Sequence, residues 1–375
     1  MAGRVRVFTS SSDDPFLNLA LEEQLFRRMG TEDRILFLWQ SRPCVVIGRF
    51  QNPWVECDLE ALERDGADLV RRQSGGGTVY HDGGNSNFTF LGPAVSFDPD
   101  KNLEMVTAAL DVLGIHAEIS SRHDILAEGF KVSGSAFRKK RDRALHHGTL
   151  LFSADREKLS RYLAAPNLNI DARGVASVRS RVVNLADLKP GLDHHQFCGA
   201  VTEAFLGRFD SEGPEAGGTA PPPADLSALG GLETAAPGRP DSPGGVIELK
   251  ASDLDGEGRV YRETLRSWEW RFGKTPAFAQ RLAGVFRGRP VEVVLQVRDG
   301  LIEGVFPGTE EGKPGTEEAG IAACLNERLA GVRYGRRDMA AALGKPPAAD
   351  GEIGTEATTG TEEPEQWLLS LLQGG

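Results

Sequence analysis

Cysteine is scarce in this chain, and long apolar runs are missing. The 375 residues include four cysteines, which are far apart and form no C-x-x-C pair: Cys44, Cys57, Cys198 and Cys324. This usage predicts reduced thiols and no structural zinc. No run approaches ~20 apolar residues, and the N-terminal segment MAGRVRVFTSSSDDPF lacks the apolar core of a leader peptide. We therefore expect a soluble, cytoplasmic protein that does not enter a membrane.

Positive charge is also in deficit. The formal net charge is −11, which argues against nonspecific binding to nucleic acid, since that needs a basic surface. The main local exception is RKKRDR at 138–143, with five positive charges against one negative. Apart from this, 40% hydrophobic and 26% charged residues are ordinary values for a soluble enzyme.

Apolar periodicity and turn residues predict a mixed α/β (α+β) fold with a largely antiparallel sheet. Strands are expected at 4–8, 35–39, 44–48, 115–119, 130–133 and 149–152, and helices at 15–29, 58–65, 101–113, 155–163 and 193–208. Asp14 followed by Pro15 is typical of a helix start. The alternation over 291–306 predicts a hairpin that turns at Asp299 and Gly300.

The composition changes at 211–245, where eight glycines and seven prolines occur without an aromatic residue. Such a segment buries too little apolar surface to order itself, so we expect a flexible linker or insert. We accordingly expect a first domain at 1–210, a small accessory domain at 246–343, and a low-complexity tail at 344–375. The terminal EQWLLSLLQGG predicts a short apolar helix, and the sequence leaves open whether this helix docks.

The segment RRQSGGGTVYHDGGNSNFTF at 71–90 carries the strongest chemical signal. Three successive glycines allow positive φ and bring bare N–H groups close to an anion. Arg71 and Arg72 offer planar forks for phosphate or carboxylate. A glycine-rich turn with surface arginines is the alternative, which the nearby His81 and Asn85 make less attractive.

A second constellation spans 120–152. Lys131 lies in FKVSGSA, where a short strand followed by small residues would place one ammonium over a close-fitting ligand. A solvated lysine before a turn is the ordinary alternative. His146 and His147 are adjacent in a strand, so they face opposite sides and make a poor metal pair. The basic run at 138–143 directly follows Lys131, and it is either a solvated loop or a docking site for an acidic partner.

Together these segments resemble the lipoate–protein ligase A family and the related mitochondrial lipoyltransferases. The family pattern RR-x-SGGG-x-V-x-HD-x-GN, then K-[IV]-SG-[ST]-A, then HH-x-TLL appears here in order. NLALEEQLF, VVIGRFQNPWVEC and WEWRFGKTPAF match as well, the last at the entrance to an accessory C-terminal domain. The resemblance covers roughly 5–210 and, more loosely, 246–306.

The resemblance implies a catalytic domain of the biotin/lipoate ligase type, at 1–210, that binds lipoate and ATP. Family members use ATP and Mg²⁺ to convert lipoate to lipoyl-AMP, then transfer the lipoyl group to a lysine of an acceptor protein. The implied acceptors are the lipoyl domains of 2-oxoacid dehydrogenase E2 subunits and the glycine cleavage H protein. No tightly bound prosthetic group is implied, and a monomer is expected.

The resemblance also assigns roles to residues. Lys131 matches the catalytic lysine that bridges the carboxyl group and the α-phosphate. The nucleotide or lipoyl-AMP is expected to contact Arg72, Gly75, Gly76, Gly77, Thr78, Val79, Tyr80 and Asp124. His81, Asp82 and Asn85 are expected to brace the loop. The lipoyl tail is assigned to the region of Leu17–Leu21 and Val45–Val46, which fit an apolar core equally well.

Asp124 matches the aspartate of a family G-R-N-D motif. It is assigned to Mg²⁺ or to the orientation of Lys131, with a turn cap as the alternative. The chain departs from that motif, because Ser121 replaces the glycine and His123 the asparagine.

Three other functions remain to be weighed. Cysteine-dependent acyl transferases of the superfamily are disfavoured, because no cysteine lies between Cys57 and Cys198. A transferase that uses preformed lipoyl-AMP is compatible with the sequence. A non-catalytic lipoate or adenylate binder is less attractive, since such a protein needs no transition-state cation such as Lys131.

Overall fold

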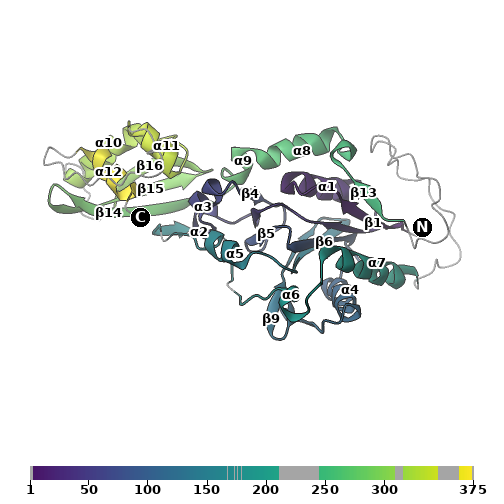
Figure 1. The fold of residues 1–375 in the computed structure, drawn as a ribbon. Helices are drawn as coiled ribbons and strands as arrows, with labels where there is room; N and C mark the ends of the chain where they lie inside the picture. Colours follow the sequence, from purple (N-terminus) through teal and green to yellow (C-terminus); the bar gives the residue numbers. More distant parts are fainter. Residues whose placement is uncertain are drawn as a thin grey trace. The chain divides into compact units, whose positions relative to one another are not determined.

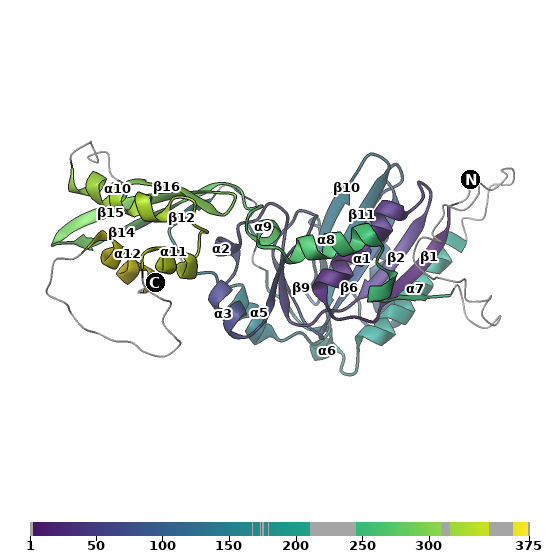
Figure 2. The same ribbon diagram turned by 90° about the horizontal axis from the view of Figure 1, so that it is seen from above.

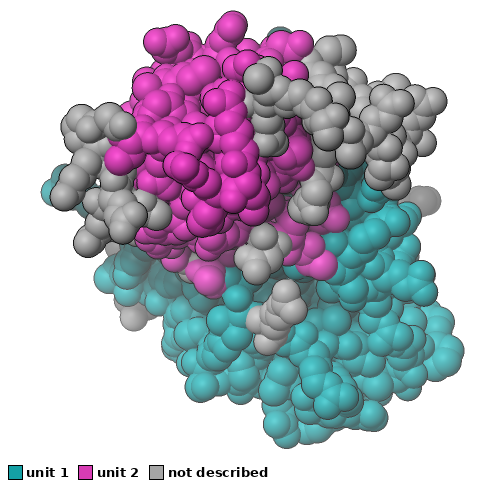
Figure 3. Space-filling model, turned by 90° about the vertical axis from the view of Figure 1, so that its left-hand side faces the viewer, with its two compact units in different colours: residues 1–49, 60–163, 177–267 teal, residues 50–59, 164–176, 268–375 magenta. Residues whose placement is uncertain are grey.

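The structure is a computed structural model that describes residues 3–166, 168–172, 174, 176–178, 180–210, 245–308, 316–344 and 363–373. These residues form two compact units, coloured separately in Figure 3. The first comprises Met1–Arg49, Glu60–Leu163 and Ser177–Ser267, and the second comprises Phe50–Leu59, Ala164–Ala176 and Trp268–Gly375. The expected linker, at 211–245, lies outside the described residues except for its last glycine. The domain boundaries expected from the sequence stay a prediction.

A six-stranded sheet forms the centre of the first unit, in the order β10-β11-β6-β2-β1-β13. The first four strands of that order pair antiparallel, whereas β1 pairs in parallel with β2 and β13. Their bounds are β1 Val5–Ser10, β2 Arg34–Trp39, β6 Asn85–Pro93, β10 Ser135–Lys139, β11 Arg143–Leu151 and β13 Ile247–Leu249.

Helices cover both faces of this sheet (Figures 1 and 2). One face carries α1 (Pro15–Arg28) and α8 (Gly256–Arg266), and the other carries α4 (Pro99–Val112) and α7 (His194–Asp210). Apolar side chains of α4 and α7 pack with Leu36, Phe88 and other sheet residues in one buried cluster. The sheet is thus covered on both sides by helices, and the buried cluster is the main core of this unit.

Two three-stranded sheets complete the first unit. The first has the order β4-β3-β5, and the second, β7-β8-β9, is antiparallel. Their bounds are β3 Cys44–Ile47, β4 Asp68–Arg71, β5 Val79–His81, β7 Glu118–Ile119, β8 Ile125–Ala127 and β9 Phe130–Ser133. The remaining helices of the unit are α3 Leu59–Arg64, α5 Arg156–Tyr162 and α6 Leu185–Leu188, with a 3₁₀ turn at Ala251–Asp253.

Local sequence explains where α1 begins and ends. The Asp14 side chain accepts a hydrogen bond of 3.0 Å from the Phe16 N–H, and Pro15 occupies the first helical position. Arg27 and Arg28 lie in the last turn, where cations complement the helix dipole. The helix start predicted from Asp14-Pro15 is therefore confirmed.

The second unit is built on the antiparallel sheet β12-β14-β15-β16. Asp299 and Gly300 have φ values of 50° and 72°, so the predicted hairpin turn is confirmed with the backbone of a type I′ turn. The elements of this unit are α2 Pro53–Glu56, β12 Ile170–Ala172, α9 Trp268–Arg271, β14 Phe278–Phe286, β15 Arg289–Arg298, β16 Leu301–Pro307, α10 Glu317–Leu329, α11 Arg336–Ala342 and α12 Pro364–Gln373.

The C-terminal helix α12 docks within the second unit. Trp367 and Leu368 are buried in its apolar cluster, which settles the question that the sequence left open. The expected mixed fold, rich in antiparallel pairs, is confirmed. In the part of the chain that the structure describes, no helix is both long enough and apolar enough to cross a membrane.

Candidate active site

The glycine-rich loop, which we define as residues 72–78, connects β4 to β5 and closes over Arg72. The Arg72 guanidinium donates to the carbonyl oxygens of Val46 (3.1 Å), Gly75 (2.6 Å) and Gly77 (2.7 Å), and to Ser74 Oγ (2.9 Å). Burial lowers the pKa of Arg72 to about 10. Arg72 thus stabilises the conformation of the loop, because buried carbonyl groups need hydrogen-bond donors.

Arg71 is also fully buried and donates to the carbonyl oxygens of Gly48 (3.3 Å) and Arg49 (3.0 Å). The sequence predicts that both arginines offer their forks to an anion. In this structure their guanidinium groups bond protein carbonyls, those of Gly75 and Gly77 within the loop and those of Val46, Gly48 and Arg49 in and after β3. The binding of an anion by these arginines stays a prediction.

Only one glycine of the triplet uses a conformation that disfavours other residues. Gly76 has φ = 85°, whereas Gly75 and Gly77 do not have positive φ. A Cβ at Gly76 would lie 2.9 Å from Arg72 Nη2 and 3.4 Å from the Ala136 Cβ. The expected series of positive-φ glycines is therefore reduced to one residue, and that residue packs against the start of β10.

The downstream part of the loop is tied to a segment around Ser177. The Thr78 N–H donates to Ser177 Oγ over 2.9 Å, and Val79 and Tyr80 continue into β5. Asp82 accepts from the backbone N–H groups of Gly84 (2.8 Å) and Asp155 (2.9 Å). These contacts hold in place the end of the loop and the residues of β5 that follow it.

His81, at the end of β5, and Asn85, at the start of β6, are buried. Among the described residues, neither ring nitrogen of His81 has a hydrogen-bond partner, and the ring lies edge-on to Trp39 with centroids 5.8 Å apart. Burial, followed by the repulsion of the Arg72 charge, lowers the pKa of His81 to about 3. The Asn85 side-chain amide donates to Asn87 Oδ1 over 3.1 Å. His81 is consequently a neutral, buried ring at neutral pH.

Lys131 lies in β9 and pairs with Asp124, which directly precedes β8. The Lys131 Nζ lies 2.8 Å from Asp124 Oδ1, and the two side chains are 25% and 15% exposed. A Cβ at Gly134 would lie 3.2 Å from Nζ, so this glycine packs closely beside the ammonium. A partly exposed cation with one carboxylate partner can still bind an incoming anion.

The strand β11 connects the loop to the lysine strand. Its His147 Nε2 lies 2.7 Å from Ser74 Oγ, and its Nδ1 lies 3.0 Å from Glu22 Oε2. The Thr149 N–H donates to the Gly134 carbonyl over 3.1 Å. One strand thus contacts both the glycine-rich loop and the turn after Lys131.

His146 faces away from these contacts, as the strand alternation predicts. Its Nε2 lies 3.0 Å from Ser135 Oγ, and its Nδ1 lies 3.3 Å from the Asn102 amide. Burial, followed by the nearby imidazole of His147, lowers the pKa of His146 to about 3. The two histidines make no shared metal site, and no group of three metal-binding side chains exists among the described residues.

The sequence motifs do not single out several residues that the structure brings to this site. Glu22 is a buried carboxylate of α1 that accepts from Thr89 Oγ1 (2.7 Å) and pairs with His147. Burial raises its pKa, but the contacts with His147, Thr89 and Arg138 outweigh that effect and leave it lowered. Two adjacent acidic residues, Glu22 and Glu23, between the apolar positions Leu21 and Leu25 of α1 are the signal that was available.

The segment from Arg181 to Val183, which pairs with Lys131, is a second part of the site that the sequence motifs do not single out. The Lys131 N–H donates to the Arg181 carbonyl (3.0 Å), and the Val183 N–H donates to the Lys131 carbonyl (3.2 Å). Arg181 is exposed, and its guanidinium lies 5.3 Å from the centre of the Phe130 ring. The run SVRSRVV at 177–183, rich in serine and arginine, was the available signal.

These motifs, separate in sequence, therefore meet in one place. Backbone N–H groups of a tight loop, an ammonium and a carboxylate together suit a ligand that carries negative charge. Leu17–Leu21 and Val45–Val46, assigned from sequence to the lipoyl tail, are buried, and their role as a pocket stays a prediction.

Comparison with known proteins identifies the family. Residues 14–206 match the family model of the lipoyl protein ligase A/B catalytic domain. The chain is also 34% identical over 373 residues to lipoate-protein ligase A of Psychrobacter cryohalolentis, a match that covers 99% of this chain and 100% of the relative. This chain belongs to the lipoate–protein ligase family. It is accordingly an enzyme of the ligase class.

Solved structures of family members share the fold. Plasmodium falciparum LipL1, crystallised in complex with lipoate, is 24% identical, with a TM-score of 0.60 over 98% of this chain and 100% of that chain. A lipoate-protein ligase A bound with ATP is 22% identical, with a TM-score of 0.54 over 72% of this chain and 98% of that chain. The lipoate ligase fold extends over both compact units in the first case.

Proposed function

We propose that this lipoate–protein ligase activates lipoate with ATP and then transfers the lipoyl group to a lysine of an acceptor protein. The observation that carries the proposal is the position of Lys131. Its ammonium lies beside Gly134 and Asp124, and Ala136, two residues after Gly134, lies 3.4 Å from the position that a Cβ at Gly76 of the glycine-rich loop would take. This nearness of the Lys131 turn to the glycine-rich loop supports the proposal that the ammonium and the loop backbone act on one ligand.

In the first step a lipoate carboxylate oxygen attacks the α-phosphorus of ATP, and the bond to the leaving pyrophosphate breaks. Negative charge accumulates on the phosphoryl oxygens, so oriented donors lower the barrier. We assign that role to Lys131 and to the backbone of Gly75–Tyr80. Arg72 acts on the nucleotide through the loop that it holds.

In the second step the amine of an acceptor lysine attacks the lipoyl carbonyl carbon, and AMP leaves with the electrons of the broken anhydride bond. Lys131 stabilises the negative charge on the phosphate of the departing AMP, as it stabilises the charge on the α-phosphate of ATP in the first step. Both chemical steps thus use the same cation.

We assign Mg²⁺ to Asp124. Magnesium is commonly held by one or two carboxylates together with substrate phosphates, and a single partly exposed carboxylate beside Lys131 fits that mode. When bound, the ion neutralises phosphate charge. Asp124 also orients the Lys131 ammonium through their ion pair.

We infer that the acceptors are lipoyl domains of 2-oxoacid dehydrogenase E2 subunits and the glycine cleavage H protein, and that they approach the β10–β11 hairpin. Arg138 and Arg143 bond Glu23 and Asp142, respectively, so they are occupied. Lys139, Lys140 and Arg141 at the hairpin tip are exposed. These three cations suit an acidic acceptor surface.

The full reaction tests the function. Purified protein is incubated with ATP, Mg²⁺, lipoate and an E2 lipoyl domain, and AMP release and acceptor mass are measured. Lipoate-dependent AMP release together with a lipoylated acceptor supports the proposal. Lipoylation that occurs only when lipoyl-AMP is supplied would instead make the protein a transferase.

A charge reversal tests the docking surface. Replacing Lys139, Lys140 and Arg141 by glutamate should raise the KM for the acceptor about tenfold and leave the KM for ATP unchanged. Equal changes in both constants would contradict the assignment of this hairpin to the acceptor.

A further inference from the structure

A cavity of about 120 Å³ lies beside the central sheet, on the face that α4 and α7 cover (Figure 1). It is lined by the end of β6, the start of α4 and the end of α7, together with Arg34 at the start of β2. Among the described residues that line it, none belongs to the candidate active site. The proposed reaction therefore makes no use of this cavity.

Phenylalanine rings form the apolar wall of the cavity. Phe90 of β6 and Phe205 of α7 are 3% and 2% exposed, and their ring centroids lie 6.0 Å apart. The Phe209 ring follows one helical turn later, 5.2 Å from that of Phe205. Buried rings that pack closely against one another keep their positions, so this wall is a fixed apolar surface. Such a surface suits the apolar body of a ligand.

The cavity also contains the guanidinium group of Arg34. Its Cζ lies 5.0 Å from the centre of the Phe209 ring, and its Nη1 donates to Ser96 Oγ over 3.3 Å. Within the described part of the chain, Arg34 forms no ion pair with a carboxylate. An arginine stacked on an aromatic ring still presents N–H donors at its edge, in the geometry that matches a carboxylate.

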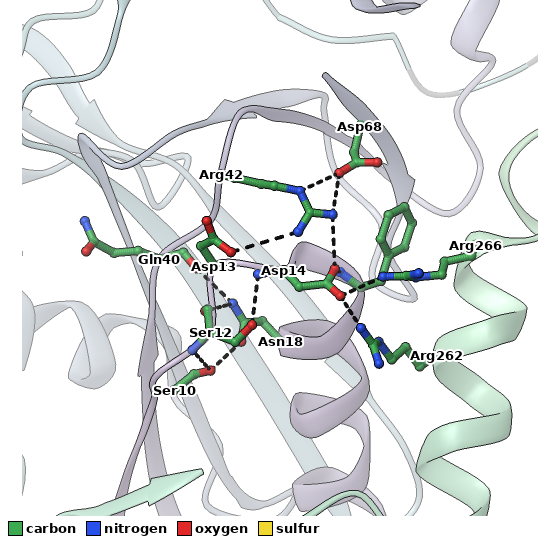
Figure 4. Close-up of polar contacts among 11 residues, drawn as sticks. Ser10, Ser12, Asp13, Asp14, Asn18, Gln40, Arg42, Asp68, Arg262 and Arg266 are labelled. Carbon is green, nitrogen blue, oxygen red and sulfur yellow. Dashed lines mark hydrogen bonds and ion pairs between the residues drawn. The ribbon is translucent and has the colours of Figure 1, made fainter. Parts of the chain in front are cut away.

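Arginines on the opposite face of the sheet are paired differently. Arg262 and Arg266 of α8 both donate to Asp14 Oδ2, the second over 2.7 Å (Figure 4). The Asp14 side chain is only 10% exposed. Two arginines there share one carboxylate, whereas Arg34 pairs with none of the described ones, although the net charge of the chain is −11. The charge of Arg34 is therefore available to an external anion.

Three other charged side chains line the cavity among the described residues, and each has a partner. Lys101 Nζ lies 4.0 Å from Asp98 Oδ2, and Asp98 Oδ1 accepts from the Lys101 N–H as part of the cap of α4. Arg208 Nη1 lies 3.8 Å from Glu104 Oε2. The cation that distinguishes this cavity is consequently Arg34.

We propose that this cavity binds a short-chain monocarboxylate. Its carboxylate bonds Arg34, and its apolar body lies against Phe90 and Phe205. A cavity of about 150 Å³ holds a benzene molecule, so this one holds an apolar body of roughly four or five carbons. Inorganic phosphate would meet the same cation but leave the rings uncovered, and an alkylammonium ion would be repelled by Arg34. The inference goes beyond the proposed function and does not depend on it.

Two substitutions test the charge and the space separately. Arg34→Gln removes the cation and keeps a polar side chain. Gly92 of β6 lines the cavity, and apart from its chain neighbours a Cβ there would have Arg34 Nη1 as its nearest contact, at 3.6 Å. Gly92→Val should therefore fit the strand and fill part of the cavity while Arg34 remains. Arg64→Gln alters an exposed arginine of α3 and is the matched control.

Binding of sodium hexanoate to the purified 375-residue chain is measured by calorimetry at constant ionic strength, without ATP, lipoate or acceptor. The wild type and Arg64→Gln should bind it with a Kd on the order of 1 mM. Saturating hexanoate should also slow amide exchange at the end of α7, in residues 203–209. Arg34→Gln should raise the Kd about tenfold or more, since a charge-assisted hydrogen bond is lost. Gly92→Val should abolish the slower exchange at 203–209.

Melting temperatures establish that both variants fold, and if one does not, the other decides. An absence of hexanoate binding by the wild type would overturn the inference. Binding and exchange that stay unchanged in the folded variants would also overturn it, because the ligand would then lie elsewhere, for example in the active site. Phosphate or hexylammonium that slows exchange as much as hexanoate would contradict the monocarboxylate class. Hexanoate binding here by a protein without lipoylation activity would contradict the proposed function alone.

Discussion

The glycine-rich loop and the β8–β9 hairpin each supply a cation to the candidate site, but the two cations are held differently. Arg72 is buried and bonds three carbonyl groups and a hydroxyl of its own neighbourhood. Lys131 is partly exposed and has Asp124 as its charged partner. The difference separates their roles: Arg72 maintains the shape of the loop, and Lys131 stays accessible to a substrate.

The largest effect is expected from Lys131→Ala. Loss of the ammonium removes transition-state stabilisation and should lower the lipoylation turnover by about 10²–10³, with little change in melting temperature. The exposed Lys101→Ala is the matched control and should stay within twofold of wild type in the same reaction. Turnover of Lys131→Ala within threefold of wild type would remove Lys131 from the mechanism.

Arg72→Ala should lower the stability of the folded protein as well as its activity. The carbonyl groups of Val46, Gly75 and Gly77 would lose their donor, which should lower the free energy of unfolding by about 3 kcal/mol. Urea unfolding followed by circular dichroism measures this, with the exposed Arg64→Ala as control. A variant as stable as the wild type would show that Arg72 does not maintain the loop.

Asp124→Asn tests the partner of Lys131. The substitution keeps the size and removes the charge, so kcat should fall about tenfold and half-maximal activity should need more Mg²⁺. A lower kcat with an unchanged Mg²⁺ requirement would confine Asp124 to the orientation of Lys131. Wild-type behaviour in both respects would exclude it from the site.

The smallest effect concerns His146, which is buried and neutral. Its folded-state pKa, about 3, lies below the usual 6.5, so its contribution to stability is complete above pH 6.5 and is lost as the pH falls. Between pH 7 and pH 5.5 the loss should be about 1 kcal/mol. In urea unfolding, His146→Gln should lose about 1 kcal/mol less stability than the wild type between pH 7 and pH 5.5. The same pH dependence in both proteins would contradict the view that His146 is buried and neutral.

The sequence predicts local features of this chain better than its long-range polar contacts. The start of α1 at Asp14-Pro15 and the turn at Asp299-Gly300 follow from residues that are neighbours in sequence, and both are confirmed. The opposite orientation of His146 and His147 likewise follows from strand geometry.

Other features depend on residues that only folding brings together. The contact of His147 with Ser74 spans 73 positions, and that of Asp14 with Arg266 spans 252. No local pattern indicates such pairs. The carbonyl partners of Arg71 and Arg72 are of the same kind, because the sequence does not reveal which carbonyl groups folding brings to these guanidinium groups.

The central claim is that Lys131 and the glycine-rich loop activate lipoate. Lipoate-dependent exchange between ATP and pyrophosphate, with Mg²⁺ and without acceptor, tests it most directly. The account predicts exchange well above a control without lipoate. An absence of exchange, with transfer preserved when lipoyl-AMP is supplied, would contradict it.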